Sequence, residues 1–457
     1  MLIRYTVENF LSFKERVTFS MLPGKGLLKK EHKAEPVKGV SVLKTAVVFG
    51  ANASGKSNLI KAMAFGKNLL LLGTRADGLI DYPAFRLNKD CKECNTRMEY
   101  ELQANGKNYA YGFVFNTHGI EEEWLYELTK QKETAVFERN KQDKQFNIDY
   151  LLKLNNDGKE RQFLQFLTEA TPDNQLFLHE VLTRKIKSNI TNVDDLFNVI
   201  GWFVDTLKFV FPHDKYKQGI TIKAANDTDL KRYYAELLRY FDTGIESITL
   251  IKVDIDKLNI PKDLLTVIND DLQKSSKRDI HGVLNFNGDI YIISPDANGL
   301  KAQKFKTVHA IAGSAKPAFF DLKDESDGTV RIIDYIPLII DLMRGNKVFV
   351  IDEMERSLHP NLFYDIFALF LQHCNSVNSQ LIVSTHESSL LTQKLLRKDE
   401  IWFVVKDTHG VSALHSLEDY KIRFDKEIRK DYLMGRFKGV PRLGSHYEIT
   451  SLFESND

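Results

Sequence analysis

The chain has few cysteines, no long apolar run and almost no net charge. Its 457 residues include only 3 cysteines, which excludes the disulfide framework of a small secreted protein. No apolar run approaches the roughly 18 residues needed to span a bilayer. The formal net charge of +1 gives no overall attraction to nucleic acid or acidic lipid. We therefore expect a cytoplasmic protein without a membrane partner.

Two of the cysteines, Cys91 and Cys94, form a C-x-x-C pair that has neither a second pair nor a nearby histidine. This favours reduced thiols near a turn over a zinc or redox site, although the second interpretation stays open. Residues 1–10 alternate like a strand and lack a signal-peptide core. The hydrophobic content of 43% and the charged content of 27% are typical of a globular protein. The length predicts two or three substructures.

The most informative segment is residues 49–58, which read F-G-A-N-A-S-G-K-S-N and fill the pattern G-x-x-x-x-G-K-[ST]. An apolar run precedes the segment and a helical pattern follows it, as this phosphate-binding loop requires. Glycines let backbone amides wrap phosphates, and the helix start attracts negative charge. We expect Lys56 to reach the β- and γ-phosphates of ATP and Ser57 to bind Mg²⁺. The predicted nucleotide-binding residues here are Gly50, Asn52, Ala53, Ser54, Gly55, Lys56, Ser57 and Asn58.

Two further apolar runs end in polar residues. Residues 347–353 read K-V-F-V-I-D-E, and a strand ending there would bring Asp352 to the phosphate loop as a ligand of Mg²⁺. Glu353, one residue later, is suited to deprotonate an attacking water. Residues 380–386 form a second such strand, and its terminal His386 could contact the γ-phosphate or the water. The helical pattern at 360–374 between them predicts a right-handed parallel crossover.

At this point the sequence resembles a known group. Asn52, Ser54, the Asp352-Glu353 pair, the S-L-H-P that follows at 357–360 and His386 are similar to the ABC-type ATPases of the SMC, RecF and OLD group. The opening V-E-N-F-L-S-F resembles the "NF-x-SF" strand of that group. Closer still, the chain resembles the stand-alone prokaryotic AAA-family (RloA-like) ATPases, which are often found beside defence genes. The segments that carry this closer resemblance are 325–331, 399–403 and 432–437.

The resemblance implies an α/β fold of the ABC-type P-loop ATPases, with a mixed or parallel sheet, flanking helices and an N-terminal antiparallel β-subdomain. It also implies a signature loop made by Ser326, Gly328 and Thr329, which would contact the γ-phosphate held by another subunit. Such composite ATP sites predict a homodimer or a higher homo-oligomer. A plain helix N-cap would use the same residue types at that position. Residues 357–359 would form the D-loop, and no glutamine loop can be placed, since 82–87 has no glutamine.

The spacing of the motifs predicts an interrupted ATPase. The interval between Lys56 and Asp352 is far longer than one parallel crossover needs. We expect an N-terminal ATPase half at 1–159 with three strands and an Asn105-Gly106 hairpin turn. A compact, mainly helical insertion is expected at 160–305 and the second ATPase half at 306–457. The insertion shows no sustained heptads, which excludes a long coiled coil.

The end of the chain separates two classes of function. Residues 387–457 follow His386, and after a helix and a strand they leave no room for the Toprim nuclease of OLD-type proteins. The leading hypothesis is a dimerising ATPase that hydrolyses ATP, has no nuclease activity of its own, and senses or regulates a separate effector, such as a nuclease, in prokaryotic antiphage defence. The alternative is a RecF- or SMC-like DNA-binding ATPase of repair or recombination, for which nucleic acid would be a ligand.

Overall fold

The apolar run before the phosphate loop forms β3 (Thr45–Phe49), which is buried along its whole length. Its residue types suit a strand of a sheet that is covered on both faces. β3 leads directly into the loop with the G-x-x-x-x-G-K-[ST] pattern, and helix α1 (Lys56–Leu72) follows the loop. The predicted strand–loop–helix unit is confirmed.

These features belong to a computed structural model. It describes residues 1–440 except 76, 89–93, 156, 185, 187–189, 217–223, 225–226, 259, 275–281, 297–298 and 421–426. The C-x-x-C pair is not fully described, because Cys91 lies outside these residues. The chain divides into two units, each described by itself below. The first unit is Met1–Pro212, Gly345–Met354 and Phe367–Asp457, and the second is His213–Arg344 and Glu355–Ile366.

In the first unit, β3 lies inside a six-stranded sheet in the order β18-β17-β3-β16-β15-β9. β3 pairs in parallel with β16 and β17, β15 pairs in parallel with β16 and β9, and the β17–β18 pair is antiparallel. Helix α10 connects the parallel strands β15 and β16, as the sequence predicts. The bounds are β9 (Leu207–Val210), β15 (Val348–Ile351), α10 (Pro360–His373), β16 (Gln380–Ser384), β17 (Ile401–Lys406) and β18 (Ser412–Ser416).

The first unit also holds a seven-stranded antiparallel sheet, ordered β2-β1-β4-β5-β6-β7-β8. The predicted hairpin is present between β4 and β5. Its turn residues Asn105 and Gly106 have φ values of 47° and 75°, as a type I′ turn requires. The strands are β1 (Leu2–Glu8), β2 (Val17–Ser20), β4 (Thr96–Ala104), β5 (Lys107–Asn116), β6 (Gly119–Leu128), β7 (Glu133–Asn140) and β8 (Gln145–Asn147).

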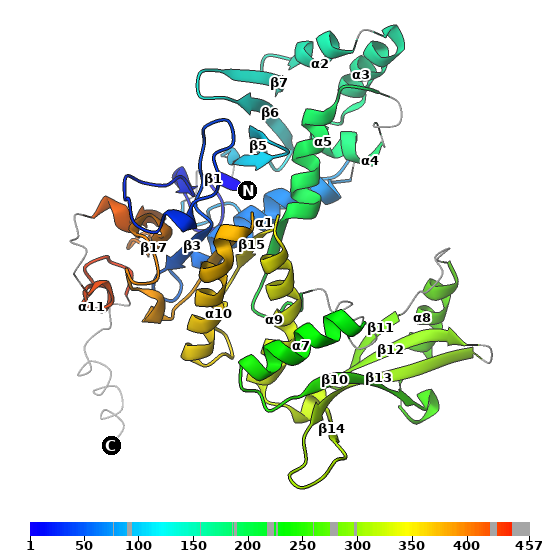
Figure 1. Ribbon diagram of the computed structural model, residues 1–457. Coiled ribbons are helices and arrows are strands. Elements are labelled where there is room, and N and C mark those ends of the chain that lie inside the picture. Colours follow the sequence, from blue (N-terminus) through cyan, green and yellow to red (C-terminus); the bar gives the residue numbers. More distant parts are fainter. Residues whose placement is uncertain are drawn as a thin grey trace, which may run out of the picture. The chain divides into compact units, whose positions relative to one another are not determined.

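Helices cover one face of this seven-stranded sheet. Figure 1 shows α2 to α5 beside the end of the sheet formed by β5, β6 and β7. Leu164, Leu167 and Phe177 of these helices share an apolar core with Tyr109 and Leu125 of the sheet. Because side chains alternate between the faces of a strand, the other face carries residues that remain partly exposed. The bounds are α2 (Asp149–Leu154), α3 (Gly158–Ala170), α4 (Phe177–Thr183) and α5 (Asp194–Gly201), with a π-helical turn at Trp202–Thr206 and α11 (Ile428–Leu433) near the end of the described chain.

The second unit combines helices with a five-stranded antiparallel sheet. This arrangement differs from the mainly helical insertion expected at 160–305. Residues 160–212 belong to the first unit, and the second unit runs past 305. Strands β11 and β12 form a hairpin in this sheet. The bounds are α7 (Thr228–Tyr240), β10 (Ser247–Val253), α8 (Lys262–Lys274), β11 (Gly282–Phe286), β12 (Asp289–Asp296), β13 (Gly299–His309), β14 (Ala318–Asp321) and α9 (Asp327–Arg344).

Among the residues that the structure describes, no helix combines the length and the apolar character that a membrane crossing requires.

Candidate functional site

The phosphate loop folds back on Lys56, whose side chain binds backbone carbonyls of the loop. Lys56, at the first position of α1, is buried, and its Nζ donates hydrogen bonds to the carbonyls of Gly50 at 2.8 Å and Ala51 at 3.1 Å. Gly55 has a φ of +114°, a conformation that other residues adopt only at a cost. Asn52 and Ala53, at the tip of the loop, are exposed. The loop therefore presents backbone amides on a short turn with a cation beneath it.

Residues from both ends of the sequence support the loop from below. The hydroxyl of Ser412, the first residue of β18, donates to the Ser54 carbonyl at 2.6 Å, and its oxygen lies 2.8 Å from the Ser12 hydroxyl. The Asn58 side chain of α1 donates to the same Ser12 hydroxyl at 2.8 Å. A Cβ atom on Gly55 would lie 2.5 Å from the Ser412 hydroxyl. We call Ser12, Asn58 and Ser412 the serine support, because together they fix the loop backbone.

The acidic end of β15 lies beside the phosphate loop. Asp352 is buried, and its Oδ1 accepts hydrogen bonds from the hydroxyls of Ser57 at 3.1 Å and Ser384 at 2.5 Å. The Ser384 hydroxyl also accepts a hydrogen bond from the Glu353 amide at 3.1 Å. Glu353 has a φ of 48°, which is uncommon outside glycine and frequent at functional sites. Ser384 thus holds the Asp352 carboxylate and the Glu353 backbone.

His386 lies between the lysine of the loop and the second carboxylate. Its Nδ1 is 3.3 Å from Lys56 Nζ, and its Nε2 is 3.9 Å from the Glu353 carboxylate. Burial lowers the pKa of His386 below its ordinary 6.5, the Lys56 charge lowers it further, and the two carboxylates oppose this shift. These influences together favour the neutral form of the ring. A neutral imidazole can accept a hydrogen bond on one nitrogen and donate on the other.

We expect Lys56→Ala to raise the pKa of His386, because the change removes a positive charge that disfavours the protonated ring. The measurement is a pH titration of the His386 ring signal by NMR, with His386→Gln used to assign the signal. Lys61→Ala is the matched control, since Lys61 lies exposed on the same helix. A His386 pKa that is identical in the wild type and in Lys56→Ala would contradict the electrostatic coupling.

The residues of this site fit a nucleoside triphosphate and Mg²⁺. The Ser54 hydroxyl is buried in the loop and has no hydrogen-bond partner among the described residues. Because buried polar groups usually have a partner, this hydroxyl is suited to bind an oxygen of a bound phosphate. A hydroxyl and a carboxylate oxygen, the ligand types that Mg²⁺ prefers, already face each other at Ser57 and Asp352. Lys56 would hold the β- and γ-phosphates. Mg²⁺, when bound, would neutralise phosphate charge.

The three residues of the predicted signature loop lie in the second unit, at the start of α9. The Ser326 hydroxyl accepts a hydrogen bond from the Thr329 amide at 3.1 Å, which is an N-cap. Ser326 is exposed, and a Cβ on Gly328 would lie 3.0 Å from the Ser357 carbonyl. The expected signature and D-loop segments are therefore neighbours within the second unit. Contact of Ser326 with phosphate stays a prediction, because an N-cap alone would place it the same way.

The residue before the signature loop is anchored to the sheet of the second unit. The Glu325 carboxylate accepts a hydrogen bond from the Thr307 hydroxyl and lies 2.7 Å from His309 Nε2. Both partners belong to β13. The position of Ser326 is thus tied to the strand that runs through the middle of that sheet.

The sequence interpretation missed the supporting residues. Ser12 lies in the N-terminal motif without a predicted role, Asn58 is one of the predicted nucleotide-binding residues, and Ser412 carries no signal, because a serine at the start of a strand is common. The 432–437 segment packs against the end of β3, where the Tyr432 ring contacts Phe49 with centroids 6.0 Å apart. The 82–87 segment contacts the N-terminal motif, since the Pro83 carbonyl accepts from the Leu11 amide at 2.7 Å.

The SMC head domain from Thermotoga maritima matches with 12% identity and a TM-score of 0.34, covering 91% of this chain and 98% of that one. An SMC head bound to the C-terminal winged-helix domain of ScpA matches with 13% identity and a TM-score of 0.38, covering 91% and 97%. No curated protein matches significantly. Residues 46–392, more than half of the chain, match the family described as "AAA domain, putative AbiEii toxin, Type IV TA system", and the chain belongs to this family.

Proposed function

We propose that this protein is a dimerising ATPase that hydrolyses ATP and regulates a separate effector in prokaryotic antiphage defence. The observation that carries the proposal is the convergence of Lys56, Ser57, Asp352, Glu353 and His386 at one edge of the six-stranded sheet. In open α/β sheets, ligands bind at the carboxyl ends of the strands. The family description, which names a toxin of a toxin–antitoxin system, supports a role in defence.

The arrangement supports a division of labour among these residues. Lys56 would bind the β- and γ-phosphates, and Ser57 with Asp352 would hold the metal. Glu353 accepts a proton from the attacking water, since its carboxylate is partly exposed at the site and its backbone is fixed by Ser384. Neutral His386 positions the water or the γ-phosphate. Each step uses a side chain already placed at the sheet edge.

Dimerisation supplies the regulation. Ser326 is exposed at the start of a helix, where its hydroxyl and the helix N-terminus suit a phosphate bound by a second copy. A contact made only while the γ-phosphate is intact distinguishes the ATP state from the ADP state. Such a differential contact is what any ligand-driven switch needs. Hydrolysis would therefore open the dimer and change the surface that the protein presents to the effector.

The test uses Glu353→Gln, which should bind ATP without hydrolysing it rapidly. We expect ATP to double its mass in light scattering, whereas ADP and Lys56→Ala should leave the mass unchanged. The same tagged variants, purified from native cells, should retain different amounts of a second polypeptide in mass spectrometry. A protein that stays monomeric with every nucleotide would contradict the dimer, and identical co-purification in both variants would contradict regulation of an effector.

A further inference from the structure

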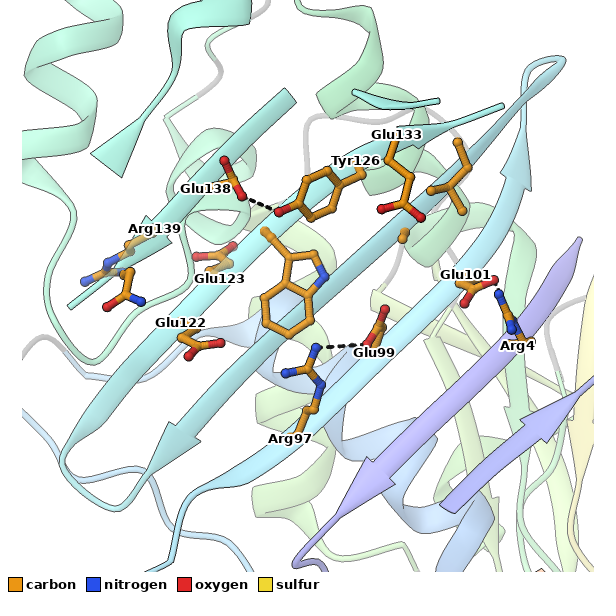
Figure 2. Close-up of a pocket in the computed structure, with 14 residues that line it drawn as sticks. Arg4, Arg97, Glu99, Glu101, Glu122, Glu123, Tyr126, Glu133, Glu138 and Arg139 are labelled. Atoms are coloured by element: carbon orange, nitrogen blue, oxygen red, sulfur yellow. Dashed lines mark hydrogen bonds and ion pairs between the residues drawn. The ribbon is translucent and has the colours of Figure 1, made fainter. Parts of the chain in front are cut away.

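Charged side chains gather around a hollow of about 420 Å³ on the partly exposed face of the seven-stranded sheet. Figure 2 shows the Arg97 guanidinium bonded to the Glu99 carboxylate and the Tyr126 hydroxyl bonded to the Glu138 carboxylate. Such pairs satisfy one another and stabilise the surface of the sheet. The buried carboxylate at the end of β15, that of Asp352, is bonded in a different way, and its main partner is Ser384.

Ser384 is the last residue of β16, which lies between the strand that leads into the phosphate loop and the strand that ends before Asp352. It is in register with Val48 of β3. The amide of the next residue, Thr385, donates to the Val48 carbonyl at 3.1 Å. Ser384 is fully buried, so bulk water does not compete for its hydroxyl. The position of this hydroxyl is therefore fixed from both sides of the strand.

The hydroxyl of Ser384 determines which oxygen of Asp352 remains open. Both hydrogen bonds of the Asp352 carboxylate within the described chain go to Oδ1, from the hydroxyls of Ser57 at 3.1 Å and Ser384 at 2.5 Å. The two donors fix the rotation of the carboxylate, because they approach the same oxygen from two different strand ends. Oδ2 is therefore the oxygen that is left for a cation or for a water molecule bound to it.

The same hydroxyl also holds the backbone of Glu353. A serine hydroxyl has one proton to donate, and donation to Asp352 leaves its lone pairs to accept the Glu353 amide, which lies at 3.1 Å. Glu353 has a φ of 48°, a conformation that a residue other than glycine keeps only where its surroundings hold it. The preceding amide, of Asp352, donates to the Val210 carbonyl on the other side at 2.9 Å. Ser384 thus fixes the turn from which the Glu353 side chain leaves.

The segment that carries Ser384 also reaches the phosphate loop. His386 follows two residues later, and its ring nitrogens lie 3.3 Å from Lys56 Nζ and 3.9 Å from the Glu353 carboxylate. One strand end therefore contacts the cation carboxylate, the proposed base and the lysine of the loop. A change in the orientation of Asp352 is passed to the Glu353 backbone through a single side chain, that of Ser384.

We propose that Ser384 is a positioning residue that couples the cation carboxylate Asp352 to the base Glu353. Its donated hydrogen bond leaves Oδ2 of Asp352 to the cation, and its accepted hydrogen bond places Glu353 for proton transfer from water. The proposal rests on the proposed function, since it concerns the same hydrolytic site, and it explains how hydrolysis depends on a bound cation. Residues of this kind, which orient metal ligands, typically change metal affinity or activity by ~10- to 100-fold when they are replaced.

The first experiment measures ATP hydrolysis as a function of ATP and of Mg²⁺. Ser384→Ala should lower kcat by at least ~10-fold and raise the Mg²⁺ concentration for half-maximal rate, while KM for ATP changes by less than ~3-fold. Ser384→Thr keeps the hydroxyl and should recover most of the rate. A normal kcat with a normal Mg²⁺ requirement in Ser384→Ala would overturn the proposal.

Ser379 provides the matched control at the opposite end of the same strand. It is fully buried directly before β16, and its hydroxyl accepts a hydrogen bond from the Lys347 amide, directly before β15, at 3.4 Å. Ser379→Ala thus removes an equivalent buried hydroxyl far from the phosphate loop. We expect it to lower the midpoint of thermal unfolding about as much as Ser384→Ala and to leave turnover unchanged. An equal loss of turnover in both variants would show that the hydroxyl only stabilises the sheet.

The second experiment does not depend on hydrolysis. In the nucleotide-free protein, Ser384→Ala should speed hydrogen exchange of the Glu353 amide by at least ~10-fold, as measured by NMR, whereas Ser384→Thr and Ser379→Ala should not. Isothermal titration with ATP, in Mg²⁺ and in EDTA, should show a smaller gain in affinity from Mg²⁺ in Ser384→Ala than in the wild type. A wild type without ATPase activity would contradict the proposed function alone. Unchanged exchange and an unchanged gain from Mg²⁺ would overturn the coupling through Ser384.

Discussion

Lys56→Ala should weaken ATP binding by at least ~100-fold, the scale expected when a buried charged partner is removed. The Lys56 ammonium holds the carbonyls of Gly50 and Ala51 in the loop, so the change removes a phosphate ligand and also loosens the loop. Isothermal titration with ATP measures the effect. Lys61→Ala, on the exposed side of the same helix, should bind ATP normally. Equal affinity in Lys56→Ala and the wild type would exclude this loop as the nucleotide site.

Glu353→Gln should have the opposite profile to Lys56→Ala: we expect unchanged ATP affinity and hydrolysis that is slower by ~10²-fold or more. The amide keeps the size of the side chain but cannot take a proton from water. Release of phosphate at saturating ATP reads the rate, and Glu15→Gln is the control for loss of one carboxylate. Wild-type turnover in Glu353→Gln would remove Glu353 from the role of general base.

The other large effect is expected for Ser326→Arg, which should abolish turnover while the isolated subunit still binds ATP. Ser326 is exposed at the start of α9, and arginine there would replace the hydroxyl that is proposed to contact the phosphate held by a second copy. Ser314→Arg, in the exposed loop between β13 and β14, is the matched control and should remain active. Turnover and nucleotide affinity are measured on the same preparations.

A mixing experiment makes this prediction sharper. In a composite site, Ser326→Arg contributes an intact phosphate loop and Lys56→Ala contributes an intact signature loop. An equimolar mixture of the two inactive variants should therefore recover activity through mixed dimers. Full activity of Ser326→Arg alone, or no recovery in a mixture shown to contain mixed dimers, would contradict shared ATP sites.

The parts of the fold that local patterns control were predictable from the sequence. The strand before the phosphate loop, the α1 helix, the strand ending before Asp352 and the Asn105-Gly106 turn each depend on neighbouring residues. The predicted mixed sheet and N-terminal antiparallel sheet are confirmed as well. These agree because hydrophobic periodicity and turn chemistry act over a few residues.

The sheet of the second unit could not be predicted in the same way. β13 carries lysines at every second or third position, so its alternation is mostly polar and resembles an exposed loop or helix. The apolar residues Tyr234 and Leu238 follow the helical spacing of α7, and such spacing favours a helical lobe for the whole region. Pairing between β10 and β13 joins residues 49 to 61 positions apart, and no local pattern encodes such a pairing.

The serine support could not be predicted from the sequence either, and the reason is physical. Ser12 and Ser412 are 400 positions apart in the chain, and each is an ordinary residue in its own surroundings. Their importance comes from a shared hydrogen-bond network under the phosphate loop. Only the fold brings them together.

The position of β3 has a consequence for how the protein is made. Its two neighbours in the sheet, β16 and β17, begin at residues 380 and 401, and Ser412 follows on β18. A nascent chain that has just left the ribosome with its phosphate loop therefore lacks both flanking strands and one of the supports of the loop. The nucleotide pocket is completed only when most of the polypeptide has been synthesised, so chains released early carry the motif without the site.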